Sequence, residues 1–150
     1  MEPKRKIVPP VYLLLALSTM FGLHHWAPLA RLIAPPYTYV GVVFVALALA
    51  LGVPAIGAFK KAGTPVIPFE RATTLVTSGS FRFTRNPMYL GMVLLLLGAA
   101  VLFGTAGALL PIPVFVWIIQ MRFIHGEERF LEDLFGKDYV AYKSRVRRWI

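Results

Sequence analysis

Residues 88–121 read MYLGMVLLLLGAAVLFGTAGALLPIPVFVWIIQM, two apolar runs on either side of the small residues Gly104-Thr105-Ala106-Gly107. Neither run contains a charged side chain. Each run is near the lower end of the roughly 17–25 residues that cross a bilayer. Backbone groups in hydrocarbon must be hydrogen-bonded internally, which favours helices there. The stretch therefore predicts a tight helical hairpin with spans at about 88–103 and 106–121.

Two further apolar stretches precede this hairpin, at about residues 11–27 and 37–59. The whole chain is 57% apolar and only 15% charged, whereas soluble domains have roughly 45–50% apolar and about 25% charged residues. We therefore expect an all-α integral membrane helical bundle of about four transmembrane helices, forming a single membrane domain over residues 1–150. The absence of cysteine excludes disulfides, cysteine-bound metals and thiol catalysis, and we expect no metal site.

The charged residues are confined to three segments, which predict the orientation of the bundle. Fifteen of the sixteen Lys and Arg residues, all but Arg31, lie before the first span, in the loop 60–87, or in the tail 122–150. All seven acidic residues lie in the same segments. The positive-inside rule then places both termini and the loop in the cytoplasm of a multi-pass cell-membrane protein. The basic excess favours membrane lipids as partners, and nucleic acid is not expected.

The loop and the tail hold the residues that are capable of chemistry. Asn86-Pro87 opens the third span, with Asn86 as the expected N-cap and Arg85 beside it. A helix N-terminus next to basic residues favours an anionic or polar ligand. Earlier in the loop, residues 71–76 (RATTLV) are β-prone. In the tail, residues 127–135 predict an amphipathic helix that ends at Gly136, and a second one follows from about Asp138.

A glutamate pair, Glu127 and Glu128, follows the fourth span closely. Adjacent helical residues point in different directions, so at most one of the two is expected to face inward. A carboxylate beside a membrane-embedded groove is costly unless it is paired. One of these two glutamates is therefore a candidate ligand contact, although a solvated helix face remains open as the alternative.

Two motifs follow one another in the second half of the chain. The first is TTLVTSGSF at 73–81 followed by RNPMYLG at 85–91, and the second is GEE at 126–128 followed by Leu131, Phe135-Gly136, Tyr139 and Tyr142. In this order they resemble the isoprenylcysteine carboxyl methyltransferase and phospholipid methyltransferase superfamily. The resemblance covers about residues 73–148. It implies a membrane-embedded methyltransferase that uses S-adenosyl-L-methionine and methylates a lipophilic small molecule or lipid at the cytosolic membrane face.

The resemblance also assigns candidate residues by motif position. It implies cofactor contacts from Thr73, Thr74, Leu75, Val76, Phe81, Asn86, Pro87, Met88, Tyr89 and Glu127, with Arg85 beside them. The candidate catalytic residues are Arg85 or Arg122, either of which would neutralise a carboxylate of the cofactor or the acceptor, and Glu128. The chain departs from the eukaryotic pattern at four positions. Asn86 and Thr73 stand where histidines are usual, Phe81 replaces a tyrosine, and Phe123 occupies the place of an arginine, to which Arg122 is nearest.

The nature of the acceptor stays open at this stage. A carboxylate or thiolate acceptor needs no general base, whereas an amine acceptor would need one, and Glu128 and His125 are the candidates. Two other functions are alternatives. One is an NADPH-dependent sterol or enone reductase, since such enzymes have a similar C-terminal region. The other is a non-catalytic lipid-binding protein whose basic face anchors it to the membrane.

Overall fold

The computed structural model describes residues 8–66 and 72–150. The predicted basic cluster Lys4-Arg5-Lys6 therefore lies outside the described residues, as do Glu2, Glu70 and Arg71. All regular secondary structure in the described part of the chain is helical, apart from one isolated bridge between Arg31 and Thr105. The all-α prediction is confirmed for these residues. The β-prone segment forms no strand where it is described, at residues 72–76.

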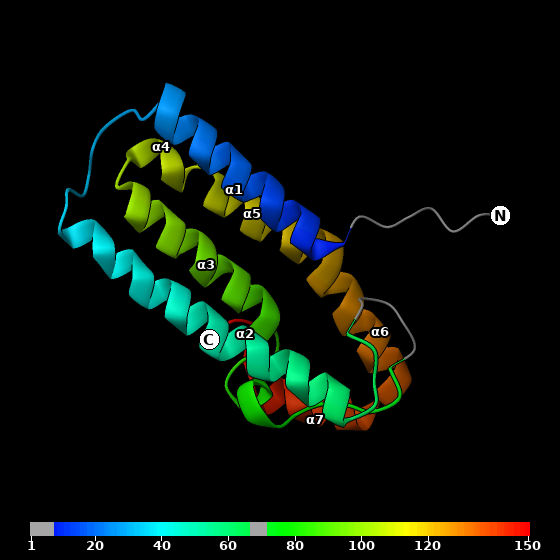
Figure 1. The fold of residues 1–150 in the computed structure, drawn as a ribbon. Coiled ribbons are helices and arrows are strands. Elements are labelled where there is room, and N and C mark those ends of the chain that lie inside the picture. The colour runs from blue at the N-terminus through cyan, green and yellow to red at the C-terminus, as the bar shows by residue number, and fades with distance from the viewer. Residues whose placement is uncertain (1–7, 67–71) are drawn as a thin grey trace.

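Long antiparallel helices form the body of the molecule, and at one end of it the last long helix runs on before a short one, α7 (Lys137–Arg145), turns back (Figure 1). The cavity described below lies at that end. The helices are α1 (Pro9–Trp26), η1 (Tyr37–Val40), α2 (Gly41–Lys61), η2 (Gly79–Arg82), α3 (Pro87–Phe103), α4 (Ala106–Leu109), α5 (Pro111–Ile119), η3 (Gln120–Ile124), α6 (His125–Phe135) and α7 (Lys137–Arg145).

The predicted hairpin lies between α3 and α4. Gly104 ends α3 with a φ of 67°, a left-handed conformation that glycine adopts without strain. The connection from α1 to α2 crosses this turn: the backbone N–H groups of Leu32 and Ile33 both donate to the Gly104 carbonyl, and Ala106 N–H donates to the Ala30 carbonyl. These bonds satisfy backbone groups at the hairpin turn and fix the end of the bundle opposite the cavity.

The fourth predicted span is part of a longer helical stretch. The sequence predicts its end at about residue 121, but helical backbone continues from α4 through α6, from Ala106 to Phe135. A π-helical turn, η3, joins the apolar α5 to the charged α6. The prediction of a separate amphipathic helix at residues 127–135 is thus wrong in its start, because no residue breaks the helix at the membrane exit. Its end at Gly136, and the next helix from Lys137, are confirmed.

Two helical stretches are long and apolar enough to cross a membrane by length and composition, Tyr37–Lys61 and Ala106–Phe135. The apolar α3 is shorter, at 17 residues. These helices indicate a membrane protein, whereas a count of four spans stays a prediction that depends on α1 and α3 crossing as well.

Helices α2 and α3 pack closely along their lengths because small residues face one another. A Cβ added at Gly98 would lie 2.8 Å from the Gly41 carbonyl oxygen and 2.8 Å from Cγ2 of Val45. Nearer the cavity, a Cβ added at Gly91 would lie 3.1 Å from the Ala48 carbonyl oxygen. Such close backbone approach is typical of membrane helices, in which packing of small residues drives association. The α2–α3 pair thus serves as a rigid support for the cavity end.

This packing predicts that Gly98→Ala destabilises the protein. The added methyl group would meet backbone on α2, and overpacking of this kind costs about 1–3 kcal/mol. Thermal unfolding in detergent micelles, followed by circular dichroism, measures the effect. The matched control is Gly57→Ala in α2, where an added Cβ has no atom within 4 Å. The control should be neutral or stabilising by up to about 1 kcal/mol. Equal stability of the two variants would contradict the close packing.

Candidate functional site

Segments that lie far apart in the sequence meet around one cavity at the N-terminal end of α3. The loop 72–76, η2, the start of α3, α6 and α7 all contribute to it, with Phe59 from α2. The cavity measures about 80 Å³. The lining residues are Phe59, Ala72, Thr74, Leu75, Val76, Phe81, Arg85, Asn86, Pro87, Met88, Tyr89, Glu127, Glu128, Leu131, Tyr139 and Tyr142.

A short hydrogen bond joins α3 to α6 at the deep side of this cavity. The hydroxyl of Tyr89 donates to Oε1 of Glu127 over 2.6 Å. Tyr89 is buried, with 4% of its surface exposed. The phenol therefore fixes the direction of the Glu127 carboxyl, which lines the cavity. A positioned carboxyl can accept hydrogen bonds from the hydroxyl or amino groups of a ligand.

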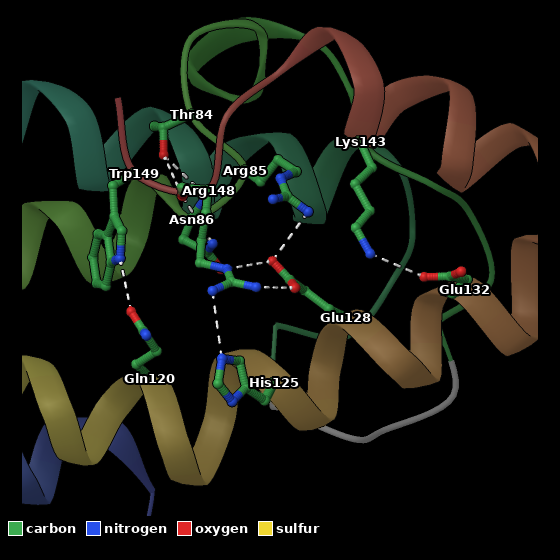
Figure 2. A network of polar contacts seen from close by, with 10 residues as sticks. All are labelled: Thr84, Arg85, Asn86, Gln120, His125, Glu128, Glu132, Lys143, Arg148 and Trp149. Atoms are coloured by element: carbon green, nitrogen blue, oxygen red, sulfur yellow. Dashed lines mark hydrogen bonds and ion pairs between the residues drawn. The ribbon is translucent and has the colours of Figure 1, made fainter.

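The second glutamate, Glu128, is buried between two arginines (Figure 2). Arg148 grips it with two bonds, from Nε to Oε1 over 2.9 Å and from Nη2 to Oε2 over 2.7 Å. Arg85 approaches from the other side, with its Nη1 3.0 Å from Oε1 of Glu128. The Glu128 bonds raise the pKa of Arg148. Two guanidinium groups thus surround one carboxylate, and the cluster keeps one positive charge.

Arg85 has hydrogen-bonding capacity left over. Its side chain is 9% exposed, yet its Nε and Nη1 make no hydrogen bond with the part of the chain that the structure describes. The contact between Nη1 and Glu128 is thus an ion pair without hydrogen-bond geometry. Buried donors that lack an acceptor cost free energy. Since Arg85 lines the cavity, a ligand anion placed there would satisfy these donors.

Aromatic side chains, among them Phe59 and Phe81, form another wall of the cavity. The rings of Phe59 and Phe81 pack edge to face at a centroid distance of 5.3 Å. The hydroxyl of Tyr142 on α7 donates to the Phe81 carbonyl oxygen over 2.7 Å. Burial raises the pKa of Tyr142, so this hydroxyl keeps its proton and remains a donor. The bond fastens α7 to the loop that carries Phe81, and the wall offers a surface for an aromatic ligand group.

The structure brings most of the predicted site residues together. Eleven of the thirteen line the cavity, Thr74, Leu75, Val76, Phe81, Arg85, Asn86, Pro87, Met88, Tyr89, Glu127 and Glu128. Two do not. The hydroxyl of Thr73 donates to the Gly63 carbonyl over 3.3 Å, and the exposed side chain of Arg122 donates to the hydroxyl of Tyr12 over 3.3 Å.

Asn86 occupies the predicted N-cap position of α3, but its side chain makes no capping hydrogen bond. Its Nδ2 instead donates to the carbonyl oxygen of Arg148 over 3.0 Å. The predicted bond from the α3 backbone to the Asn86 side chain is therefore wrong. The side chain bonds instead to the returning C-terminal segment, which brings the Arg148 carbonyl to this position. This asparagine is bonded to the tail of the chain, although its surface still lines the cavity.

Several residues of the site have no predicted role. Phe59 and Leu131 line the cavity, and Arg148 holds Glu128. The amphipathic period of residues 127–135 places Leu131 one turn after Glu127, a signal that predicts its inward face. Arg148 carries no such signal, because it is one of several basic residues in a terminal run.

An apolar groove adjoins the cavity on the side of the bundle. It lies between α1 and α2, is floored by α3, and measures about 500 Å³. The groove and the cavity share Met88 and Tyr89 as lining residues. Its remaining lining is apolar, namely Val8, Pro9, Pro10, Leu13, Ala48, Leu49, Gly52, Val53, Ile56, Val66, Gly91, Met92 and Leu95.

Comparison with known proteins identifies relatives of this chain. The phospholipid methyltransferase family model matches residues 37–138. An uncharacterized protein of Haemophilus influenzae is 40% identical over 63 residues, which is 42% of this chain and all of that protein. Protein-S-isoprenylcysteine O-methyltransferase B of Arabidopsis thaliana is 32% identical over 77 residues, 51% of this chain and 39% of that protein.

A third relative is methanethiol S-methyltransferase 1 of Bradyrhizobium diazoefficiens, 42% identical over 71 residues, 44% of this chain and 22% of that protein. The matches thus span less than half of the length of these two methyltransferases. Neither of these two is named as a reductase or as a lipid-binding protein.

The fastening of α7 to the loop predicts the effect of Tyr142→Phe. Loss of the hydroxyl leaves the Phe81 carbonyl without this donor, at a cost of about 1–3 kcal/mol. Denaturation in detergent measures it. The control is Tyr12→Phe, which removes an exposed hydroxyl that contacts Arg122 and should change stability by less than about 0.5 kcal/mol. If both variants unfold like the unmodified protein, the Tyr142 bond does not hold α7 in place.

Proposed function

The chain belongs to the phospholipid methyltransferase family, and from this premise we propose that it is a membrane methyltransferase using S-adenosyl-L-methionine. The acceptor is a lipophilic molecule, and the reaction takes place at the cytosolic membrane face. The named relatives are methyltransferases. One observation carries the proposal: a single cavity collects eleven candidate residues from the loop, the start of α3 and α6.

The residues around the cavity fit such a methyl donor. The unpartnered donors of Arg85 suit its carboxylate, and the aromatic wall with Phe81 suits its adenine ring. Glu127, held by Tyr89, accepts from its hydroxyl or amino groups. The cavity, at about 80 Å³, is far smaller than the usual range of about 300–1,000 Å³ for small-molecule pockets. Binding therefore requires the walls of the cavity to move apart.

The residue inventory matches the demands of methyl transfer. S-Adenosyl-L-methionine supplies a methyl group on a sulfonium, which a nucleophilic acceptor atom takes by in-line displacement. The protein's part is to hold the two reactants in line and to exclude water. At the N-terminal end of α3, the buried Tyr89–Glu127 pair and the aromatic wall position the reactants and exclude water. Glu128 is bound by Arg148 on both oxygens, so it is poorly placed to act as a base, which favours an acceptor that needs none.

The groove between α1 and α2 supports a lipophilic acceptor. Its lining is almost wholly apolar, and it meets the cavity at Met88 and Tyr89. An apolar chain lying in the groove would place its polar head beside the cavity. A space of about 500 Å³ lies within the usual range of about 300–1,000 Å³ for small-molecule pockets.

The charge distribution supports the cytosolic orientation. In the described chain, α6, α7 and the end of α2 carry most charged side chains, and they surround the cavity end of the bundle (Figure 1). Arg31 lies at the opposite end, beside the hairpin turn. By the positive-inside rule the cavity faces the cytoplasm, where S-adenosyl-L-methionine is available.

The proposal predicts that Glu127→Gln weakens donor binding about tenfold or more, because a neutral amide replaces the carboxyl that Tyr89 orients. Isothermal titration of the purified protein with S-adenosylhomocysteine in detergent measures the affinity. Glu132→Gln is the control, since this glutamate lies on the same helix but is exposed and paired with Lys143. Equal affinities of the two variants would remove Glu127 from the donor site.

The groove predicts a separate effect on the acceptor. Gly52→Phe places a bulky ring in the groove, where an added Cβ has no atom within 4 Å. We expect methyl transfer from labelled donor to extracted membrane lipids to fall about tenfold or more, with donor affinity unchanged. Val43→Phe, at an exposed position on the same helix outside the groove, should keep the activity. Undiminished transfer by Gly52→Phe would exclude this groove as the acceptor site.

A further inference from the structure

The last five residues of the chain, Val146 to Ile150, form a strap that returns to the start of α3. The backbone N–H of Arg85 donates to the Arg147 carbonyl over 2.9 Å. The Arg148 carbonyl accepts from both Thr84 Oγ1, over 3.2 Å, and Asn86 Nδ2, over 3.0 Å. Trp149 Nε1 donates to Oε1 of Gln120 over 3.2 Å. Figure 2 shows these side chains gathered where α3, α6 and the strap meet.

These bonds fix the backbone from which the Arg148 side chain projects. Thr84, which is buried at 1% exposure, also accepts from the backbone N–H of Asn86 over 3.1 Å. The strap and the turn before α3 are therefore one hydrogen-bonded unit. From that unit the planar guanidinium of Arg148 reaches Glu128 with two parallel bonds, a geometry that a lysine ammonium has no means to reproduce.

Glu128 has two arginine neighbours and bonds them unequally. Both of its oxygens receive hydrogen bonds from Arg148, whereas Arg85 has only an ion-pair contact with Oε1. Without Arg148, the carboxylate would turn its full hydrogen-bonding capacity toward Arg85. Glu128 would then compete directly with any ligand carboxylate for that guanidinium.

We propose that Arg148 is a positioning residue that holds Glu128 away from full pairing with Arg85, so that Arg85 stays available to bind the carboxylate of the methyl donor. This inference rests on the proposed function. It gives the strap a part in ligand recognition, although the strap itself does not line the cavity. Arg148 acts through Glu128 on Arg85, and so it touches neither the donor nor the acceptor.

The test compares two ligands that differ in the carboxylate. S-Adenosylhomocysteine carries one and 5′-methylthioadenosine does not. We expect Arg148→Ala and Arg148→Lys to weaken S-adenosylhomocysteine binding about tenfold or more, the value for one lost charge-assisted contact. Binding of 5′-methylthioadenosine should be unchanged, which also reports that the adenosine part of the site is folded.

The second part of the test is a rescue. In Arg148→Ala combined with Glu128→Gln, the competing charge is gone, and the affinity for S-adenosylhomocysteine should return. The control is Arg147→Ala, an equal loss of charge in the same strap that leaves the backbone contact to Arg85 intact. It should bind both ligands normally.

The outcomes separate this inference from the proposed function. If the unmodified protein fails to bind S-adenosylhomocysteine, the proposed function fails and the inference falls with it. If it binds, but the Arg148 variants weaken both ligands equally or the rescue fails in a folded protein, Arg148 has only a structural role and the inference alone is wrong. Should the double variant not fold, the ratio of the two affinities in Arg148→Lys decides.

Discussion

A carboxylate buried in protein must be paired, and Glu128 satisfies this requirement with arginines from two distant parts of the chain. Arg85 precedes α3, and Arg148 is two residues from the end of the sequence. Their convergence on one carboxylate ties α3, α6 and the C-terminal strap together at the cavity. The loop carrying Phe81 is fastened to the same unit through Tyr142. The geometry of the whole site thus depends on how this single negative charge is neutralised.

The same cluster explains why the cavity favours an anion. Two guanidinium groups and one carboxylate leave an excess of one positive charge, held in a region with little solvent access. Electrostatic interactions are stronger there than at an exposed surface. The excess lies on Arg85, whose Nε and Nη1 lack a hydrogen-bond partner within residues 8–66 and 72–150. In the neighbouring Tyr89–Glu127 pair, by contrast, the hydroxyl already donates to the carboxyl. At Arg85 the site therefore lacks a hydrogen-bond acceptor, which a ligand would supply. At its other end the site presents the carboxyl of Glu127, which Tyr89 positions.

Sequence reasoning recovers the parts of this arrangement that depend on local pattern. The apolar runs and the residues around Gly104 predict the hairpin because hydropathy and a left-handed turn are local properties. The two motifs predict that residues 73–89 and 127–128 meet, and the cavity collects residues from both, although not Thr73. The roles of Asn86 and Arg148 escape prediction for the opposite reason. Each depends on where the tail returns, and no local period in a basic terminal run specifies that contact. Arg122 lies outside the cavity because the continuous helix directs its side chain toward Tyr12.

The packing of the helices determines from which side the cavity is reached. α2 and α3 approach closely because Gly41, Gly91 and Gly98 remove side-chain bulk between them. Protein covers little of the rest of α2, since only 11% of the apolar 18-residue stretch within Tyr37–Lys61 is buried. α1 packs against α3, α4 and α5, so the space between α1 and α2 remains as the apolar groove. In a membrane, such a space beside a helix need not be closed by protein. Lipid chains fill it, and no apolar surface is then exposed to water. The packing that holds α2 against α3 and away from α1 thus leaves an apolar groove that reaches Tyr89.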